Sequence, residues 1–210
     1  MLISYAGFIH MENIAKTKAL KTLRSHGGTF RTSDILHFGI HPRTLYELRD
    51  SGKITQITRG IYRLADQPPT ENIELTAASM RVPDGVICLI SALSFHRITN
   101  EVPHEVYLAI PKGRQKPKLD YPPLRVFRFS PDAYSAGIEL HTIDGTKTKI
   151  YSMEKSVADC FKFRNRIGLD VALEALRLCI RNKGSRKKIL EFARICRVER
   201  VIRPYLEAIQ

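Results

Sequence analysis

The sequence contains no apolar run of the roughly 18–20 residues that a membrane-spanning helix needs, so we expect no such helix. The opening MLISYAGFIH has neither a basic start nor a small-residue cleavage site, and it is therefore not interpreted as a signal peptide. Met11 is a candidate start, and if the chain begins there, residues 1–10 would be an ill-ordered extension; the sequence leaves open whether they are native and ordered. These absences predict a cytoplasmic protein.

Cysteine is scarce and unpaired in the sequence. The four cysteines form no C-x-x-C pair, and each lies in an apolar or helical context: Cys88, Cys160, Cys179 and Cys196. The seven histidines do not cluster with them at metal-ligand spacing. The pattern predicts buried free thiols in a reducing compartment, and neither a metal site nor a cofactor is expected.

Common catalytic motifs are also missing, since G-x-x-x-x-G-K, H-E-x-x-H and G-x-S-x-G do not occur. The enzyme alternative is a metal-dependent nuclease, which needs two or three convergent acidic groups. Its candidates are Asp120, Asp132, Glu139 and Asp144, with His141 on the same strand face as Glu139. One acid beside one histidine is a weak site, and His96 and His104 are interpreted as a helix-end and a loop residue. We therefore expect no catalytic residues.

Positive charge is abundant. The chain carries 34 basic and 21 acidic side chains, a net charge of +13. Residues 1–65 carry 10 basic and 4 acidic side chains, residues 66–150 carry 10 of each, and residues 151–210 carry 14 and 7. A basic excess at both ends predicts a polyanionic partner such as nucleic acid. The alternative is a basic, solvated surface.

The first 65 residues show the element order of a winged helix-turn-helix. Helical patterns over 14–26, from Thr32 or Ser33 to 38, and over 42–50 are separated by Gly27-Gly28, by an extended piece at 29–31 and by Gly39. Two short strand patterns, ITQI and IYRL, then flank Thr58-Arg59-Gly60. In this arrangement the third helix enters the DNA groove and the hairpin is the wing.

The third helix has two distinct faces. At about 100° per residue, Leu45 and Leu48 lie on one side, with Arg43, Glu47 and Asp50 opposite. Glu47 could accept a hydrogen bond from cytosine or be a solvated charge, and Arg59 suits phosphate or the minor groove. The residues that we expect to contact DNA are Arg31, Thr32, Ser33, Arg43, Thr44, Tyr46, Glu47 and Arg59.

A linker over residues 66–72, with Pro68-Pro69, is followed by a second domain over 73–210. A helix over 73–80 and a buried helix over 86–96 precede strands over 105–110, 124–129, 138–143 and 146–151, the last two joined by Asp144-Gly145. Helices over 152–168, 170–182, 187–197 and 204–209 complete an α+β fold with a small, mainly antiparallel sheet. The basic loop PKGRQKPKLDYPP either touches nucleic acid or is solvated.

The helical patterns of the second domain predict a basic face. Its members are Lys155, Lys162, Arg166, Arg181, Arg186, Lys187 and Lys188. This face could support cooperative DNA binding or antitoxin activity. It could instead grip RNA or an acidic protein, which would make the protein an interaction module.

Three blocks of the chain resemble the AbiEi-type antitoxins of type IV toxin–antitoxin (abortive-infection) systems. They are LRSHGGTFRTSDILHFGIHPRTLYELRDSGKITQITRGIYRL, then VPDGVICLISALSFHRITNEVPHEVYLAIPKGRQKP with YPPLRVFRFS, and KIYSMEKSVADCFKFRNRIGLDVALEAL. The resemblance implies a winged-helix repressor of its own operon, binding an operator that we expect to be an inverted repeat. It also implies neutralisation of a nucleotidyltransferase-like toxin without a stable complex. A solitary regulator without a toxin is the alternative.

Overall fold

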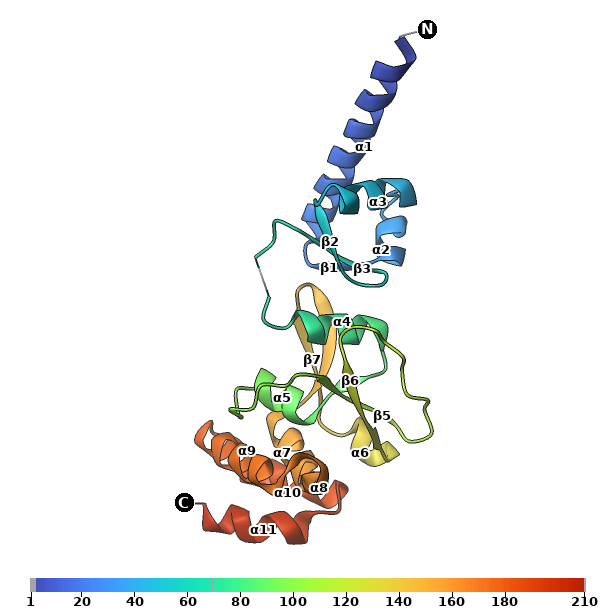
Figure 1. Cartoon of the computed structure of the whole chain (residues 1–210). Helices are drawn as coiled ribbons and strands as arrows, with labels where there is room; N and C mark the ends of the chain where they lie inside the picture. The colour runs from blue at the N-terminus through green and yellow to red at the C-terminus, as the bar shows by residue number, and fades with distance from the viewer. Residues whose placement is uncertain (1–2, 69, 210) are drawn as a thin grey trace.

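The computed structural model describes residues 3–68 and 70–209, with side chains described from residue 13 onward. Helix α1 (Ile3–His26) opens the chain and projects beyond the rest of the molecule (Figure 1). Residues 3–10, the extension considered if Met11 is the start, are helical, and residues 1 and 2 lie outside the described residues. On α1, Ala19 and Leu23 are buried, whereas Ile14 is 55% exposed.

The elements that follow α1 complete the N-terminal module, defined here as α1 to β3. They are β1 (Thr29–Arg31), α2 (Thr32–His37), α3 (Pro42–Asp50), β2 (Ile54–Thr58) and β3 (Ile61–Leu64). The strands form an antiparallel sheet in the order β1-β3-β2. A core from Ala19 to Leu64, including Ile35, Leu45 and Leu48, joins the helices to this sheet. The predicted boundaries of β1 and α3 are confirmed.

The rest of the chain builds on a five-stranded sheet. In chain order its elements are α4 (Ile73–Arg81), β4 (Val86–Ile87), α5 (Leu89–Phe95), β5 (Val106–Pro111), β6 (Leu124–Phe129), α6 (Pro131–Ser135), β7 (Ile138–Ile143) and β8 (Thr146–Tyr151). The strand order is β6-β5-β4-β8-β7. Two pairings, β5–β6 and β4–β8, are parallel and the other two are antiparallel, so the sheet is mixed rather than mainly antiparallel.

The predicted helix over 86–96 is two elements in the structure. Val86 and Ile87 form β4, and α5 begins only at Leu89. Both stretches are buried, and a continuous apolar run carries no periodicity that separates a buried strand from a buried helix. The strand β4 pairs with β5 on one side and β8 on the other, and it therefore lies at the centre of the sheet.

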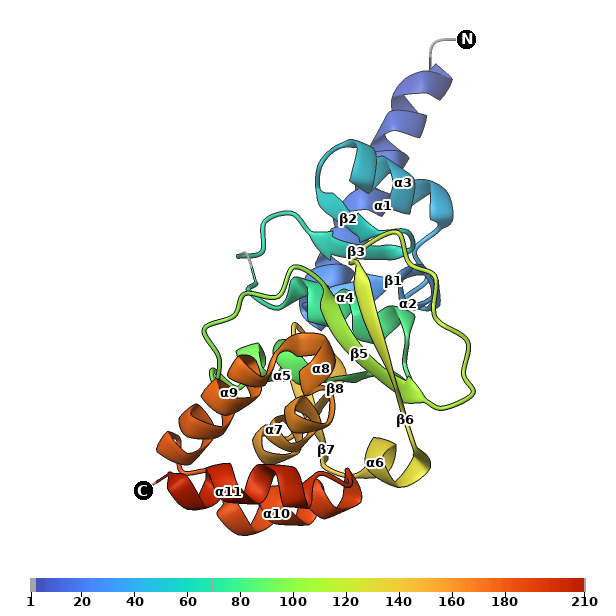
Figure 2. The ribbon, with the colours of Figure 1, turned by 60° about the horizontal axis from the view of Figure 1, so that its bottom comes forward.

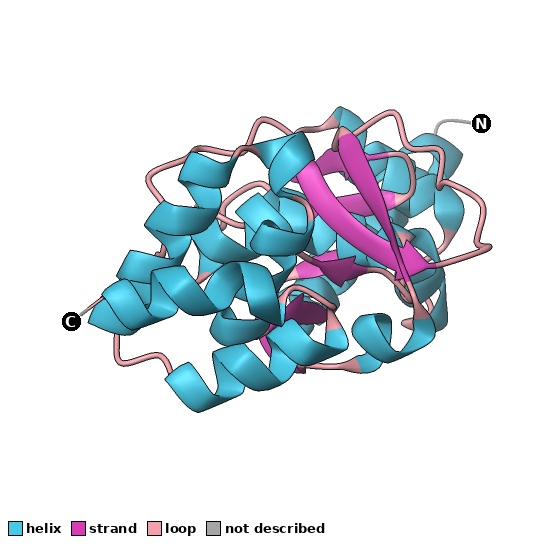
Figure 3. Ribbon diagram, turned by 90° about the horizontal axis from the view of Figure 1, so that it is seen from below, coloured by secondary structure: helices cyan, strands magenta, loops and turns pink. Residues whose placement is uncertain are grey.

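Five helices end the chain: α7 (Met153–Lys162), α8 (Arg164–Ile167), α9 (Leu169–Arg181), α10 (Arg186–Ile195) and α11 (Glu199–Ala208). They gather on one side of the sheet (Figures 2 and 3). Tyr107 and Ala109 of β5 belong to the core shared with these helices, whereas Val106, Leu108 and Ile110 belong to the core shared with α4. This alternation is the two-residue period of a strand buried on both faces.

Two contacts tie the N-terminal module to α4 and to the β7–β8 turn. Ile61 of β3, with Ile57 of β2 beside it, packs on Ala77 and Met80 of α4. At the other contact, the Thr29 amide donates to the Asp144 carbonyl in the β7–β8 turn at 3.3 Å. Here Gly28 passes so close that an added Cβ would lie 2.1 Å from that carbonyl oxygen. These contacts form what we call the seam.

Gly28→Ala tests the seam, with Gly27→Ala as its matched control. Both glycines have positive φ, +81° and +63°, so alanine is strained at either position, but a Cβ on Gly27 meets nothing within 4 Å. We expect Gly28→Ala to lower the free energy of unfolding by about 1–3 kcal/mol more than Gly27→Ala, since it alone forces a backbone shift. Urea unfolding measures the difference, and equal losses would show that the turn does not hold Gly28 closely.

Candidate nucleic-acid interface

The β2–β3 turn lies against the start of α2. The Thr32 amide donates to the Gly60 carbonyl at 2.9 Å, and the Thr32 hydroxyl reaches the same oxygen at 3.4 Å. Gly60 has φ +77°, a conformation that glycine adopts without steric cost. Strand β1 pairs Arg31 with Ile61. The structure therefore brings Arg31, Thr32 and the turn together, with the neighbouring Ser33 and Arg59 exposed.

Helix α3 begins at Pro42 and presents a polar face. The ring of His41 caps it by accepting from the Arg43 amide at 3.2 Å, which satisfies one of the unpaired amides of the first turn. Leu45 and Leu48 are 0% and 1% exposed, so the predicted inward face is confirmed. Tyr46 is 46% exposed, whereas Thr44 is half-buried.

One carboxylate on α3 binds two cations. Glu47 accepts from Arg43 Nε at 2.9 Å and pairs with Lys16 Nζ of α1 at 3.3 Å. These partners, Arg43 first, hold the pKa of Glu47 below its usual range. The Arg43 side chain remains 62% exposed, while that of Glu47 is 25% exposed. Glu47 therefore positions Arg43 and ties α1 to α3, which leaves it poorly placed as an acceptor for cytosine.

Sequence reasoning missed two cations of this region. Arg49 lies over the Tyr46 ring, 5.1 Å from its centroid, and pairs with Asp50 at 2.8 Å. The three-residue spacing of Tyr46 and Arg49 on one helix could have revealed this contact. Lys16 could not have been found in the same way, because its partner Glu47 is distant in the sequence. Between α1 and the α2–α3 turn, Lys18, His41 and Thr44 help to line a hollow of about 280 Å³.

The acidic residues of the nuclease alternative lie in different places. Asp120 is in the β5–β6 loop, Asp132 in α6 and Asp144 in the seam, whereas Glu139 pairs with His141 at 3.1 Å on β7. His96 binds the Tyr151 carbonyl through Nε2 at 2.8 Å. Among the described residues, no group of three or more His, Cys, Asp or Glu side chains is arranged to hold a metal ion. Within the same residues, no helix is long and apolar enough to span a membrane.

All four cysteines are buried free thiols, as predicted. Burial raises the pKa of each thiol above its ordinary value. A buried, protonated thiol is a small apolar group rather than a nucleophile or a metal ligand. Cys196 also donates to Asp159 at 3.2 Å.

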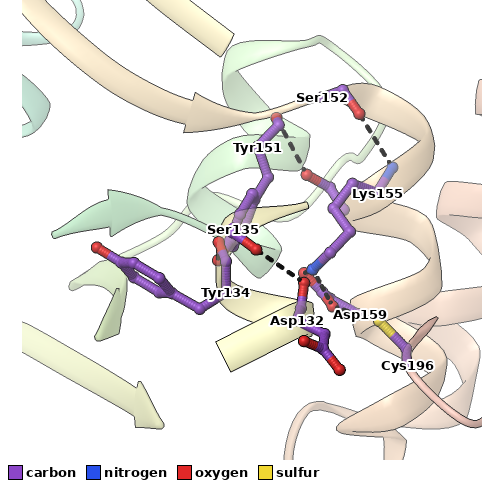
Figure 4. Close-up of polar contacts among 9 residues, drawn as sticks. Asp132, Tyr134, Ser135, Tyr151, Ser152, Lys155, Asp159 and Cys196 are labelled. Carbon is purple, nitrogen blue, oxygen red and sulfur yellow. Dashed lines mark hydrogen bonds and ion pairs between the residues drawn. The ribbon is translucent and has the colours of Figure 1, made fainter. Parts of the chain in front are cut away.

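Lys155 does not belong to a basic face, and this prediction is wrong. Its side chain is 0% exposed, and its Nζ lies 2.6 and 2.7 Å from the two Asp159 carboxylate oxygens (Figure 4). The ammonium also lies 4.1 Å from the centroid of the Tyr151 ring and 4.9 Å from that of Phe129. Burial raises the pKa of Asp159, and the adjacent ammonium opposes that shift. The lysine is on the inward side of α7, where the paired carboxylate makes its burial tolerable.

The other members of the expected face are dispersed. Arg186 donates to the Leu206 carbonyl at 2.8 Å and to the Ile209 carbonyl, and it thereby anchors the end of α11. Arg166 lies over the buried Phe127 ring, 4.2 Å from its centroid, and Lys162 is half-buried beside Phe129. Arg181, Lys187 and Lys188 are exposed around the α9–α10 connection.

The N-terminal module matches a known class of proteins, the transcriptional regulators. Residues 18–65 match the family model described as "Transcriptional regulator, AbiEi antitoxin", which confirms the resemblance over this segment. The structure is similar to the crystal structure of the RV2827C protein from Mycobacterium tuberculosis, with a TM-score of 0.53 and 14% identity over 94% of this chain and 80% of that chain. At this identity the likeness concerns the fold alone. The comparison with curated proteins gave no match.

Lys155→Met should lower the free energy of unfolding by about 3–5 kcal/mol at neutral pH, because Asp159 would then be a buried charge without its ammonium. Without Lys155, the folded-state pKa of Asp159 lies further above its unfolded value. The stability of the variant therefore falls as pH rises, and its loss of stability relative to the wild type should be smaller at pH 5 than at pH 7. Urea unfolding at both pH values measures it.

The double variant Lys155→Met/Asp159→Leu is the control, because it removes both charges. We expect it to recover most of the lost stability. A single variant as stable as the wild type would mean that Lys155 is exposed in solution.

Proposed function

We propose that the protein is a DNA-binding transcriptional repressor whose first domain, residues 1–65, contains the N-terminal module and is a winged helix-turn-helix. The support is the order α1-β1-α2-α3-β2-β3, the antiparallel sheet β1-β3-β2 and the family match over residues 18–65. The main observation is the Thr32–Gly60 contact, because it fixes the Arg59 turn beside the helices of the module. In this proposal α3 enters the major groove and the turn contacts the adjacent backbone or minor groove.

The two arginines have different roles in the proposal. Arg43 is in the first turn of α3, largely exposed and oriented by Glu47, so it suits recognition of a guanine edge. Arg59 is at an exposed turn and suits phosphate contact, which carries no sequence information. Thr44 and Tyr46, with Arg31, Thr32 and Ser33, complete the proposed DNA-binding set.

The wider role that we propose is that of a cytoplasmic antitoxin. The family description supports repression combined with antitoxin activity. Within this proposal residues 66–72 are the linker, and residues 73–210 neutralise a nucleotidyltransferase-like toxin without a stable complex. Buried free thiols fit a reducing compartment. A reading frame for such a toxin beside this gene would support the proposal, whereas its absence would favour a solitary regulator.

Arg43→Ala and Arg59→Ala separate base recognition from backbone binding. On the duplex upstream of the protein's own coding sequence, Arg43→Ala should cost about 1–3 kcal/mol and relax sequence preference. Arg59→Ala should weaken binding to all duplexes alike and lower the salt slope by about 1. Fluorescence anisotropy on the upstream duplex and on a scrambled one measures both effects.

Arg200→Ala is the control, because Arg200 is an exposed cation on α11, far from the N-terminal module (Figure 1). It removes one positive charge without touching the proposed interface. If all three variants bind as tightly as wild type at matched salt, the winged-helix proposal fails.

The remaining basic face gives a second test. Lys187 and Lys188 are exposed, whereas Arg186 anchors α11 and should be left intact. Charge reversal with Lys187→Glu and Lys188→Glu should reduce cooperative binding to two half-sites or rescue from the toxin, with unchanged unfolding. Wild-type cooperativity together with wild-type rescue would exclude a role for these lysines.

A further inference from the structure

The loop between β5 and β6, residues 112–123, is strongly cationic and is called here the basic loop. It carries Lys112, Arg114, Lys116 and Lys118 against the single acid Asp120. Arg114 pairs with Asp84, but none of the three lysines has a carboxylate partner among the described residues. All three lysines are exposed. The loop thus presents three uncompensated ammonium groups.

The basic loop is anchored along its length despite its irregular backbone. The Lys112 amide donates to the Phe129 carbonyl at 2.8 Å, and Arg128 Nε donates to the Arg114 carbonyl at 3.4 Å. Farther along, Leu119 packs against the core beneath α4. The Tyr121 hydroxyl donates to Glu74 of α4 at 2.7 Å, a bond that raises the pKa of Tyr121 to about 12. Lysines on such a held loop lose less entropy on binding than lysines on a free chain.

The same helix holds the basic loop and the proposed wing. Glu74 of α4 binds the loop, and Ala77 and Met80 of α4 pack on Ile61 of β3. Figures 1 and 2 both show the loop rising from β5 and β6 toward the β2–β3 hairpin. Lys116 and Lys118, together with Asp120, also line a hollow of about 350 Å³, so two ammonium groups face one carboxylate there.

We propose that the basic loop grips the phosphate backbone of double-stranded DNA flanking the half-site that the N-terminal module binds. This inference rests on the proposed function and extends it. The contact is sequence-independent because ammonium groups meet phosphate charge and no base edge. Each phosphate that a lysine neutralises releases condensed counterions, so the loop adds to affinity and to its salt dependence.

The test compares two duplexes from the region upstream of the coding sequence. One is the shortest duplex that retains binding, and the other is longer by about one helical turn, roughly 10 bp, on each side. The variant is Lys116→Gln/Lys118→Gln, and the control is Arg177→Gln/Arg200→Gln, which removes two exposed cations from α9 and α11. Urea unfolding checks that both variants remain folded.

Wild type and control should bind the longer duplex more tightly than the shorter one. The loop variant should bind both duplexes with nearly the affinity that wild type has for the shorter one. Its slope of log affinity against log salt on the longer duplex should be smaller by about 2, as expected for two lost phosphate contacts.

Three results would overturn the inference. One is a loop variant with wild-type affinity and salt slope on the longer duplex. Another is an equal loss of affinity for both duplexes, which would place the loop on the half-site itself. The third is a loss of binding only to single-stranded RNA of the same sequence, which would make RNA the partner. Failure of the proposed function is separate, because it appears as unchanged binding by Arg43→Ala and Arg59→Ala.

Discussion

The close approach of Gly28 to the Asp144 carbonyl fixes how the two halves of the molecule are joined. The Thr29 amide donates to that carbonyl, and a side chain at residue 28 would occupy the space of its oxygen atom. The hydrophobic contact of Ile61 with Ala77 and Met80 holds the opposite part of the seam. Together with the Arg24–Asp66 pair and the Arg63–Pro68 contact beside the connecting segment, these separated contacts restrict rotation as well as translation. The N-terminal module is therefore carried at a defined angle on the five-stranded sheet.

Helix α4 packs both on the five-stranded sheet and on the N-terminal module. Its buried residues Leu75 and Ala78, with Val82 just beyond its end, belong to the core that covers one face of the sheet. Ala77 and Met80 receive the β2–β3 hairpin, and Glu74 receives the basic loop. A single short helix thus sets the spacing between the proposed wing and a second cationic element. In our proposal this spacing lets two surfaces distant in sequence follow one polyanion, since electrostatic attraction falls off over about 8–10 Å at ordinary salt.

Local signals predicted much of this arrangement. Gly39 follows the end of α2, Pro42 begins α3 and Asp144-Gly145 marks the β7–β8 turn, because these residues act through backbone conformation alone. Long-range pairing was harder to predict. Strand β4 is recognisable only once β5 and β8 lie on either side of it. The prediction that Lys155 faces outward was wrong because its ion pair with the buried Asp159 offsets the usual cost of burying lysine. The proposed DNA contacts depend on surface chemistry that Lys16 modifies from another helix through its pair with Glu47.

The Glu47 pairs raise the question of whether Arg43 is held too firmly to bind DNA. Both pairs are partly exposed, and ion pairs screened by solvent contribute little. A bidentate contact between arginine and guanine is worth roughly 1–3 kcal/mol of discrimination. A matching base can therefore displace Glu47 from Arg43, whereas a mismatched base gains too little to do so. Lys16 then keeps Glu47 compensated after Arg43 leaves, so the carboxylate near the groove does not repel the phosphates as an isolated charge would. In this proposal, the ion pair contributes to selectivity by competing with weak contacts.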